Sequence, residues 1–190
     1  MIPIIKRIFL KKILLSAVLL LTSLLSANIT QLNSLESNFK QSIVNDQNSR
    51  ITYKGKMYAT KQNNQALWVY TTPIEKKIYY KDGSIVIIEP ELEQVIFAKL
   101  SKVPNVLSLL NSAQKISSNK FATTFNNVKY LITTNGDKIQ SIAYTDEIQN
   151  RVTIEFNAQK TNKHIDGNKF VYSIPKDYDV LEQYKRKGFN

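Results

Sequence analysis

The sequence predicts a mostly β protein of the α+β class, built on one antiparallel sheet that curls strongly toward a barrel. After residue 49, short runs of β-branched and aromatic residues follow one another, and turn residues separate them. We count about ten such runs, which is more than a flat open sheet holds without curling. Two amphipathic helical segments accompany the strands, and we expect both to lie across the mouth or the concave face of the sheet.

The run from residue 66 to residue 98 is expected to form a meander of three or four strands. Its turn signals are Pro73, Asp82-Gly83 and Glu89-Pro90-Glu91. Because strand side chains alternate, Trp68 and Tyr70 share one face, and Leu67 and Val69 occupy the other. Both faces are apolar, so this part of the sheet must be covered on both sides or enclose apolar material.

Further strands are predicted on both sides of the meander: Arg50–Ala59, Phe121–Asn126, Val128–Thr134, Ile139–Asp146, Val152–Ala158 and Phe170–Ile174. The turns between them, such as Asn135-Gly136, are short and predict antiparallel neighbours. Gly55 lies in the middle of the first of these strands. A glycine at that position predicts a bend or a β-bulge, which a curved sheet requires.

Two segments have a helical spacing of apolar residues. In the segment Thr30–Asn45, residues spaced by three and four predict an amphipathic helix: Leu32, Leu35, Phe39 and Ile43. The second segment, Val103–Ala113, has Pro104 in its first turn and Ser101 as a candidate cap. At about 10 residues it is too short to be stable alone, so it depends on packing.

Residues 1–27 are expected to be a cleaved secretory signal peptide. Four basic residues precede an uncharged apolar run, Ile13–Leu25, and Leu25-Ser26-Ala27 suits signal-peptidase cleavage. The apolar run is shorter than the ~20 residues that cross a bilayer, and an uncleaved N-terminal anchor is the alternative. Residues 28–190 would then form a single domain, of a length that supports one core.

The composition excludes several classes of protein. The chain has no cysteine, which rules out a disulfide scaffold, a thiolate metal site and a lipid-modified cysteine. The net charge is +11, and cleavage would remove four positive and no negative residues, leaving +7. The lysines are scattered, which is typical of a solvated face with weak attraction to anionic partners. Nucleic-acid binding is not expected behind an export signal.

Residues suited to catalysis are sparse. His164 is the only histidine, it lies in a polar loop, and no Gly-x-Ser-x-Gly elbow accompanies it. Glu89, Glu91 and Glu93 lack calcium-loop spacing, and we interpret them as an exposed acidic edge. The glycine patterns of nucleotide sites are absent. We therefore expect a binding protein that is not an enzyme and that has no cofactor and no metal.

Aromatic residues are abundant after residue 27, with seven Phe, ten Tyr and one Trp. Such residues fill the core of many β domains. They also suit the wall of a cavity when a curled sheet lies under helices. Residue types alone leave both interpretations open.

The order of several motifs narrows this choice. Trp68 is followed by Pro73, Asp82-Gly83, the apolar run Ile85–Ile88 and Glu93-Gln94-Val95. Further motifs flank this series: Phe39-Lys40-Gln41 upstream, then Pro104–Leu110, Phe170–Pro175 and Asp179-Val180 downstream. In this order and spacing they resemble the outer-membrane lipoprotein carrier (LolA-like) family, over most of the chain after residue 27.

The resemblance implies an incomplete β-barrel under helices, and a periplasmic chaperone that carries lipoproteins from the inner to the outer membrane. The implied partners are the acyl chains of lipoproteins and an inner-membrane lipoprotein-releasing ABC transporter. The sequence specifies no outer-membrane acceptor, and we expect a monomer. The residues expected to line the implied cavity are Leu35, Phe39, Trp68, Tyr70, Phe97, Leu107, Leu110, Ile142, Tyr144 and Phe156.

The chain departs from the family pattern at the element that controls the lid. The family commonly has an Arg-Pro pair six and five residues before the tryptophan, and the Arg holds the lid closed. Here Gln62 and Asn63 occupy those positions, and the neighbouring Lys61 lacks the planar fork of a guanidinium. We name Lys61 and Gln62 as candidates for lid control. Ala66 replaces the aromatic residue that the family often has two positions before the tryptophan.

Two other functions remain open at this stage. A related carrier or sensor could hold a different envelope lipid or a glycolipid in the same cavity. Alternatively, a packed β module without a cavity could dock on a partner through its basic face. An accessible apolar cavity would distinguish the carriers from the packed module.

Overall fold

The computed structural model describes residues 29–99 and 105–183, which form one twelve-stranded sheet with α2 (Val106–Ser112). The strands are β1 (Ser34–Val44), β2 (Arg50–Thr60), β3 (Gln65–Thr72), β4 (Lys76–Lys81), β5 (Ser84–Glu89), β6 (Gln94–Lys99), β7 (Gln114–Lys115), β8 (Lys120–Phe125), β9 (Val128–Asn135), β10 (Lys138–Thr145), β11 (Arg151–Thr161) and β12 (Asp179–Gln183). Four 3-10 turns complete the described elements: η2 (Ile29–Gln31), η3 (Gln62–Asn64), η4 (Pro90–Leu92) and η5 (Gly167–Phe170).

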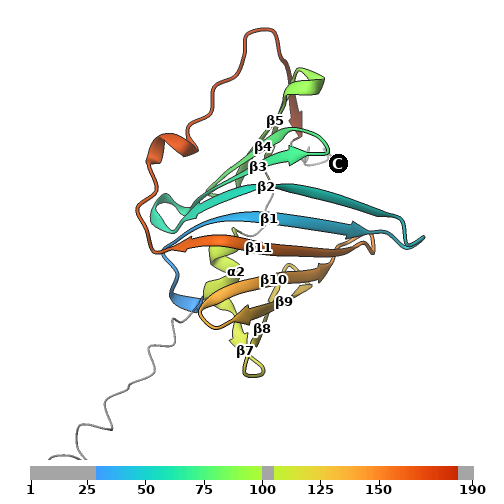
Figure 1. The fold of residues 1–190 in the computed structure, drawn as a ribbon. Coiled ribbons are helices and arrows are strands. Elements are labelled where there is room, and N and C mark those ends of the chain that lie inside the picture. The colour runs from blue at the N-terminus through green and yellow to red at the C-terminus, as the bar shows by residue number, and fades with distance from the viewer. Residues whose placement is uncertain (1–28, 100–104, 184–190) are drawn as a thin grey trace, which may run out of the picture.

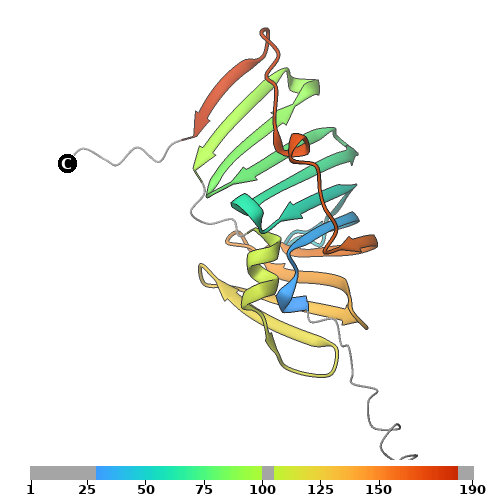
Figure 2. The same cartoon turned by 90° about the vertical axis from the view of Figure 1, so that its left-hand side faces the viewer.

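The sheet is strongly curved and does not close on itself (Figure 1). Its strand order is β12-β6-β5-β4-β3-β2-β1-β11-β10-β9-β8-β7, so β12 and β7 form the two free edges. Only β12 runs parallel to its neighbour, β6, among the described strand pairs. Figure 2 shows α2 in front of the sheet and beside η2. The predicted curved, antiparallel and incomplete barrel is confirmed.

The predicted meander is confirmed as the four strands β3 to β6. Each of its turns uses a residue that tolerates an unusual backbone or ends a strand. Asp82 and Gly83 both have positive φ, at 48° and 79°, and Glu93 ends η4 in the left-handed region at 47°. Pro73 follows directly after the end of β3.

The predicted N-terminal helix is wrong, because the segment Thr30–Asn45 consists of part of η2 followed by the long strand β1. Leu35, Phe39 and Ile43 are four residues apart, and four is close to one helical turn but is also two full periods of a strand. The side chains between them, Ser37 and Gln41, are polar although they point to the same face. The sequence of β1 therefore lacks the regular alternation of apolar and polar residues that predicts a strand. Ser37 is completely buried, which a polar face of a surface helix would not allow.

Two further boundaries differ from the prediction. The central helix begins at Val106, and Asn105 caps it, because its side chain accepts a hydrogen bond from the backbone N–H of Leu107. Ser101 and Pro104, the predicted cap and first-turn residue, lie outside the described residues. The segment Phe170–Ile174 is not a strand: Phe170 ends η5, and the next strand begins at Asp179.

The segment between η5 and β12 covers the outer face of the meander. Val86, Ile88 and Val95 form a small buried cluster, and Ile174 and Tyr178 pack against it. Leu67, on the outer face of β3, is only 5% exposed. The outer apolar face that the alternation of β3 predicts is therefore covered by the chain itself.

Gly55 marks the point where the sheet bends, as predicted. The pairing of β2 with β3 shifts register between Lys54 and Gly55, which indicates a bulge. A Cβ atom on Gly55 would collide with the backbone oxygen of Val69 and would lie 2.9 Å from the ring of Phe39. Only glycine lets β3 and the Phe39 ring approach so closely.

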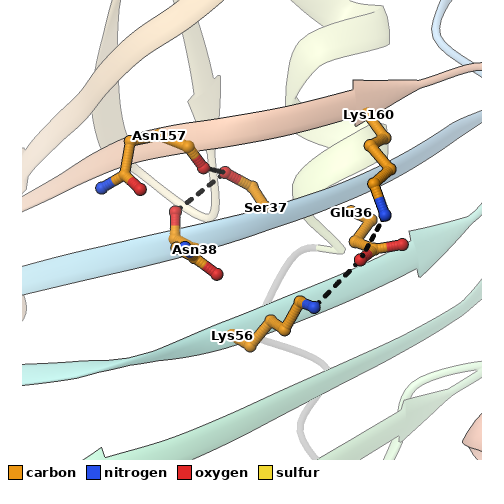
Figure 3. A network of polar contacts seen from close by, with 6 residues as sticks. All are labelled: Glu36, Ser37, Asn38, Lys56, Asn157 and Lys160. Atoms are coloured by element: carbon orange, nitrogen blue, oxygen red, sulfur yellow. Dashed lines mark hydrogen bonds and ion pairs between the residues drawn. The ribbon is translucent and has the colours of Figure 1, made fainter.

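The outer face around β1 is polar and carries a small network of contacts (Figure 3). Glu36 Oε1 lies 3.0 Å from Lys56 Nζ and 3.3 Å from Lys160 Nζ, so β1 is tied to both of its neighbours. The hydrogen bond from Lys56 holds the pKa of Glu36 below its usual value. On the opposite face of β1, the buried Ser37 hydroxyl donates to the backbone oxygen of Asn157 at 2.8 Å, beside the bulge between β1 and β11.

Candidate functional site

The concave face of the sheet carries the main hydrophobic cluster and an apolar cavity of about 460 Å³. Strands from both halves of the sheet, together with α2, contribute its walls. The apolar and aromatic side chains that line it are Ala66, Trp68, Tyr70, Ile78, Tyr80, Ile85, Val106, Leu109, Val128, Tyr130, Ile142, Tyr144, Ile148 and Ile154. The polar lining residues are fewer: Gln41, Asn105, Asn126, Asp146 and Glu147.

An aromatic cluster forms the floor of this cavity. The ring of Phe39 lies edge-on to Trp68 at 4.9 Å and to Tyr70 at 5.0 Å between ring centroids. Trp68 also lies 6.5 Å from Phe156, and Tyr130 lies 4.8 Å from Tyr144. These separations are typical of stabilising aromatic pairs. The rings therefore belong to one cluster that draws on β1, β3, β9, β10 and β11.

Helix α2 covers part of the concave face. Its face toward the sheet is entirely apolar, because Val106, Leu107, Leu109 and Leu110 are all buried. Val106 and Leu109 reach the cavity, whereas Leu107 and Leu110 are sealed in the core beside it. A helix of two turns has little stability of its own, so this apolar contact holds it in place.

A buried polar contact ties the beginning of α2 to the turn between β2 and β3. Asn105 is only 3% exposed, and its Nδ2 donates to Asn64 Oδ1 of η3 at 3.1 Å. The same side chain caps the helix. At the other end of α2, Ser112 Oγ lies 3.0 Å from Thr123 Oγ1 of β8. Each end of the helix is thus attached to the sheet by a hydrogen bond.

Two phenols in the cavity wall have a raised pKa. Burial raises the pKa of Tyr70 above its usual value, and it raises the pKa of Tyr144 to about 12. The hydroxyl of Tyr70 donates to Gln41 Oε1 at 3.0 Å. The Lys76 ammonium lies over the rings of Tyr70 and Tyr53, 4.7 and 5.0 Å from their centroids. Gln41 and Tyr70 thus form a polar contact within the cavity wall.

Known proteins resemble this chain in sequence over most of its length. An outer-membrane lipoprotein carrier protein of Campylobacter jejuni is 39% identical over 149 residues, which cover 78% of this chain and 86% of the relative. The protein of the same name from Helicobacter pylori strain J99 is 33% identical over 149 residues, covering 78% and 79%. The chain belongs to the outer-membrane lipoprotein carrier family. It matches no protein-family model.

A solved structure shares the fold of this family member at low sequence identity. An uncharacterized conserved protein from Thermus thermophilus superposes with a TM-score of 0.50 and 9% identity. The similarity covers 83% of this chain and 95% of the other. The curved, unclosed sheet therefore occurs with very different sequences.

Most of the residues that were predicted to line the cavity lie on the concave face of the sheet. Trp68, Tyr70, Ile142 and Tyr144 line the cavity. Five others belong to the hydrophobic cluster directly behind its wall: Leu35, Phe39, Leu107, Leu110 and Phe156. Leu35 and Phe39 reach this face from a strand rather than from the predicted helix.

Phe97 does not lie with the others, contrary to expectation. It packs on the outer face with Tyr79, and its ring lies 6.3 Å from that of Tyr172 in the covering segment. The register explains this position, because Phe97 pairs with Val86 and therefore projects away from the cavity. Sequence alone left open which face of the later strands is concave.

The two residues predicted to control the lid make no side-chain hydrogen bond to α2 within the described residues. Lys61 and Gln62 are exposed in the turn that carries η3. The contact to α2 comes from Asn64, two residues after Gln62. The side-chain contact between this turn and α2 is thus a pair of amides.

Sequence reasoning missed several lining residues, among them Ile78, Tyr80, Ile85, Tyr130 and Ile154. A signal for the first two was available. Trp68 pairs with Ile78, and Ala66 pairs with Tyr80, so a correct register for the hairpin around Pro73 would have placed both on the cavity face. The residues that come from turns, such as Ile148, had no signal.

A wider and shallower hollow of about 1370 Å³ lies over β9 to β11 and their turns. Charged and hydroxyl side chains are frequent in its lining, including Lys129, Arg151, Thr145 and Thr153. Its lining mixes polar and apolar residues, and no residue of α2 contributes to it. The cavity on the concave face is therefore the candidate site.

Groups for metal binding are not assembled in the part of the chain that the structure describes. No cluster of three or more His, Asp or Glu residues occurs in residues 29–99 and 105–183. His164 is exposed in the loop after β11. In the same described ranges, no helix has the length and the apolar character needed to cross a membrane.

Proposed function

We propose that this protein carries lipoproteins from the inner to the outer membrane and holds their acyl chains in the concave cavity. The observation that supports this function most is an apolar, partly roofed cavity of about 460 Å³ in a member of the outer-membrane lipoprotein carrier family. That volume falls within the range of about 300–1000 Å³ that is usual for ligand pockets.

Hydration of the acyl chains creates the need for such a carrier. An acyl chain of about 15 methylenes costs on the order of 12 kcal/mol when it is transferred into water, at about 0.8 kcal/mol per group. A carrier must bury an apolar area comparable to the surface of the acyl chain, but it must also release the chain. Aromatic and aliphatic walls bind acyl chains without strict geometry, and the small helix α2 can separate from them at modest cost.

The compartment and partners form the second part of the proposal. Residues 1–27 direct export and are removed, and residues 28–190 act as a single periplasmic domain. The cargo is received from an inner-membrane lipoprotein-releasing ABC transporter, and the carrier acts as a monomer without catalysis. The support for these points is the charge and hydropathy pattern of residues 1–27 and the family membership.

The test is to express the protein with its own signal, purify it from the periplasm without detergent, and record native mass spectra. We expect a complex with acylated lipoprotein. A complex that contains only phospholipid or glycolipid would show that the protein carries a lipid other than lipoprotein. A protein that is recovered empty and that refuses added lipoprotein would refute the carrier function.

A charge in the cavity wall should abolish loading. We expect Trp68→Glu to prevent lipoprotein binding, because the carboxylate would have to be desolvated against acyl chains. Ile78→Glu, at the paired position on β4, provides a second variant in case the first does not fold. The control is Leu92→Glu, since Leu92 is 62% exposed in η4 and lies outside the cavity. Unchanged binding by both cavity variants would refute the assignment of the cavity.

A further inference from the structure

The cavity, whose wall is mostly apolar, contains a polar spot. Gln41 of β1, Tyr70 of β3 and Tyr144 of β10 all line it. Two other polar lining residues are engaged within the protein: Asn105 bonds to Asn64 and Leu107, and Asp146 accepts hydrogen bonds from its own turn. The spot formed by Gln41, Tyr70 and Tyr144 is therefore the part of the wall best placed to make polar contacts with a ligand.

The hydrogen bond between Tyr70 and Gln41 decides what this spot offers. The Tyr70 hydroxyl donates to Gln41 Oε1, so the acceptor atom of the amide is occupied and its Nε2 hydrogens remain. Within the described residues, neither Gln41 Nε2 nor the Tyr144 hydroxyl has a protein partner. Gln41 Nε2 thus offers a ligand donors only, and the Tyr144 hydroxyl can donate as well.

The surroundings favour an acceptor in a fixed position. Lys76 pairs with Tyr70 across β3 and β4, and its ammonium lies over the rings of Tyr70 and Tyr53. The rings of Tyr53 and Tyr70 are themselves 5.7 Å apart and nearly perpendicular. The positive charge favours oxygen acceptors beside Tyr70, and the packed rings hold Tyr70, and through it Gln41, in place.

We propose that Gln41 and Tyr144, oriented by Tyr70, donate hydrogen bonds to the ester carbonyl oxygens of a diacylglyceryl group. This inference depends on the proposed carrier function, and it assigns the polar part of the cargo to a place in the cavity. The acyl chains then extend over the apolar wall formed by Trp68 and Ile78. An ester oxygen fits better than a charged group, because it needs donors but leaves no buried charge.

The spot would also give the carrier selectivity. Apolar walls alone hold any hydrocarbon chain and do not distinguish an ester-linked diacyl lipid from a simple alkane. Donors that are fixed before the ligand arrives favour the ligand whose acceptors match them. A ligand without carbonyl groups leaves these donors unpaired and binds more weakly.

The experiment compares two synthetic lipopeptides that differ only in the linkage of the chains. One carries two palmitoyl esters on a glyceryl cysteine, and the other carries two hexadecyl ethers at the same positions. Trp68 is the only tryptophan and lines the cavity, so its fluorescence reports binding to the delipidated protein. We expect the ester compound to bind about fivefold to tenfold more tightly, as one or two hydrogen bonds predict.

The double variant Gln41→Leu with Tyr144→Phe should remove this preference. We expect its affinities for the two compounds to agree within about twofold, because the ester compound loses its hydrogen bonds and the ether compound no longer leaves buried donors unpaired. Retained binding of the ether compound also shows that the variant is folded. Tyr79→Phe is the matched control, because it removes a phenol from the outer face and should keep the full preference.

The outcomes separate this inference from the carrier function. Equal binding of both compounds by the wild type would overturn the ester site and leave the carrier function intact. A double variant that loses affinity for both compounds by the same factor would also overturn it. Binding of neither compound would overturn the carrier function, and the ester site with it.

Discussion

Gly55 shows how a single residue shapes the concave face. The ring of Phe39 and the backbone of β3 both approach the position that a Cβ atom would occupy. We expect Gly55→Ala to destabilise the fold by roughly 1–3 kcal/mol, because β3 or the ring must move. The midpoint of urea unfolding measures this. Gly167→Ala is the control, since no atom lies within 4 Å of its added Cβ and its midpoint should hardly change.

A single residue, Glu36, makes the stability of the fold depend on pH. Its pKa is lowered in the folded state, chiefly by the hydrogen bond from Lys56, so the stabilisation is present above the unfolded pKa and is lost as pH falls through the folded one. Glu36→Gln should therefore cost about 1 kcal/mol at pH 7, a modest value because both lysines are partly exposed. At pH 3 and below, the difference should shrink toward zero.

Urea unfolding at the two pH values provides the measurement for Glu36. Glu91→Gln changes an exposed residue of η4 and serves as the comparison at both pH values. A loss of stability for Glu36→Gln that is the same at pH 7 and pH 3 would show that the ion pairs do not contribute.

At the scale of the element, α2 depends on contacts beyond its own backbone. Asn105 caps the helix and also bonds to Asn64, whereas Asn111 Oδ1 is buried without a partner in the described residues. The first contact stabilises the closed position, and the unpaired oxygen weakens it. The helix is thus held over the cavity by a satisfied cap, and one buried oxygen of its own opposes that packing.

Removal of Asn105 should loosen α2 without unfolding the sheet. A lost N-cap costs about 1 kcal/mol, so Asn105→Ala should speed amide exchange in residues 106–112 about fivefold. Asn64→Ala keeps the cap and should give a smaller increase. Ser108→Ala, at an exposed position of the helix, is the control. Hydrogen-exchange mass spectrometry measures all three, and identical exchange in Asn105→Ala and wild type would show that apolar packing alone holds α2.

The element β1 also shows where sequence patterns fail. Its apolar residues recur at intervals of four, which both a helix and a strand accept. The neighbouring strands decided the outcome, because β1 pairs along its whole length with both β2 and β11. Those pairs satisfy its backbone hydrogen bonds on both sides, and an isolated helix could not lie in the centre of the sheet.

At the scale of the whole molecule, the two faces of the sheet have different roles. The concave face gathers the large cluster, the cavity and α2, while the outer face of the meander is covered by the segment between η5 and β12. β12 joins β6 in parallel, so the last described strand extends the sheet at its free edge. This arrangement buries both apolar faces of β3 to β6 but keeps one side accessible to a ligand.

The amino-acid sequence by itself determined the β class, most strand positions, the meander, the bulge at Gly55 and the face shared by Trp68 and Tyr70. These features depend on alternation and turn chemistry, which act over a few residues. The tertiary structure decided that β1 is a strand, that Phe97 faces outward and that Asn64 holds Asn105. These depend on register and on contacts between segments far apart in the chain, such as Asn64 and Asn105, for which a local pattern carries no signal.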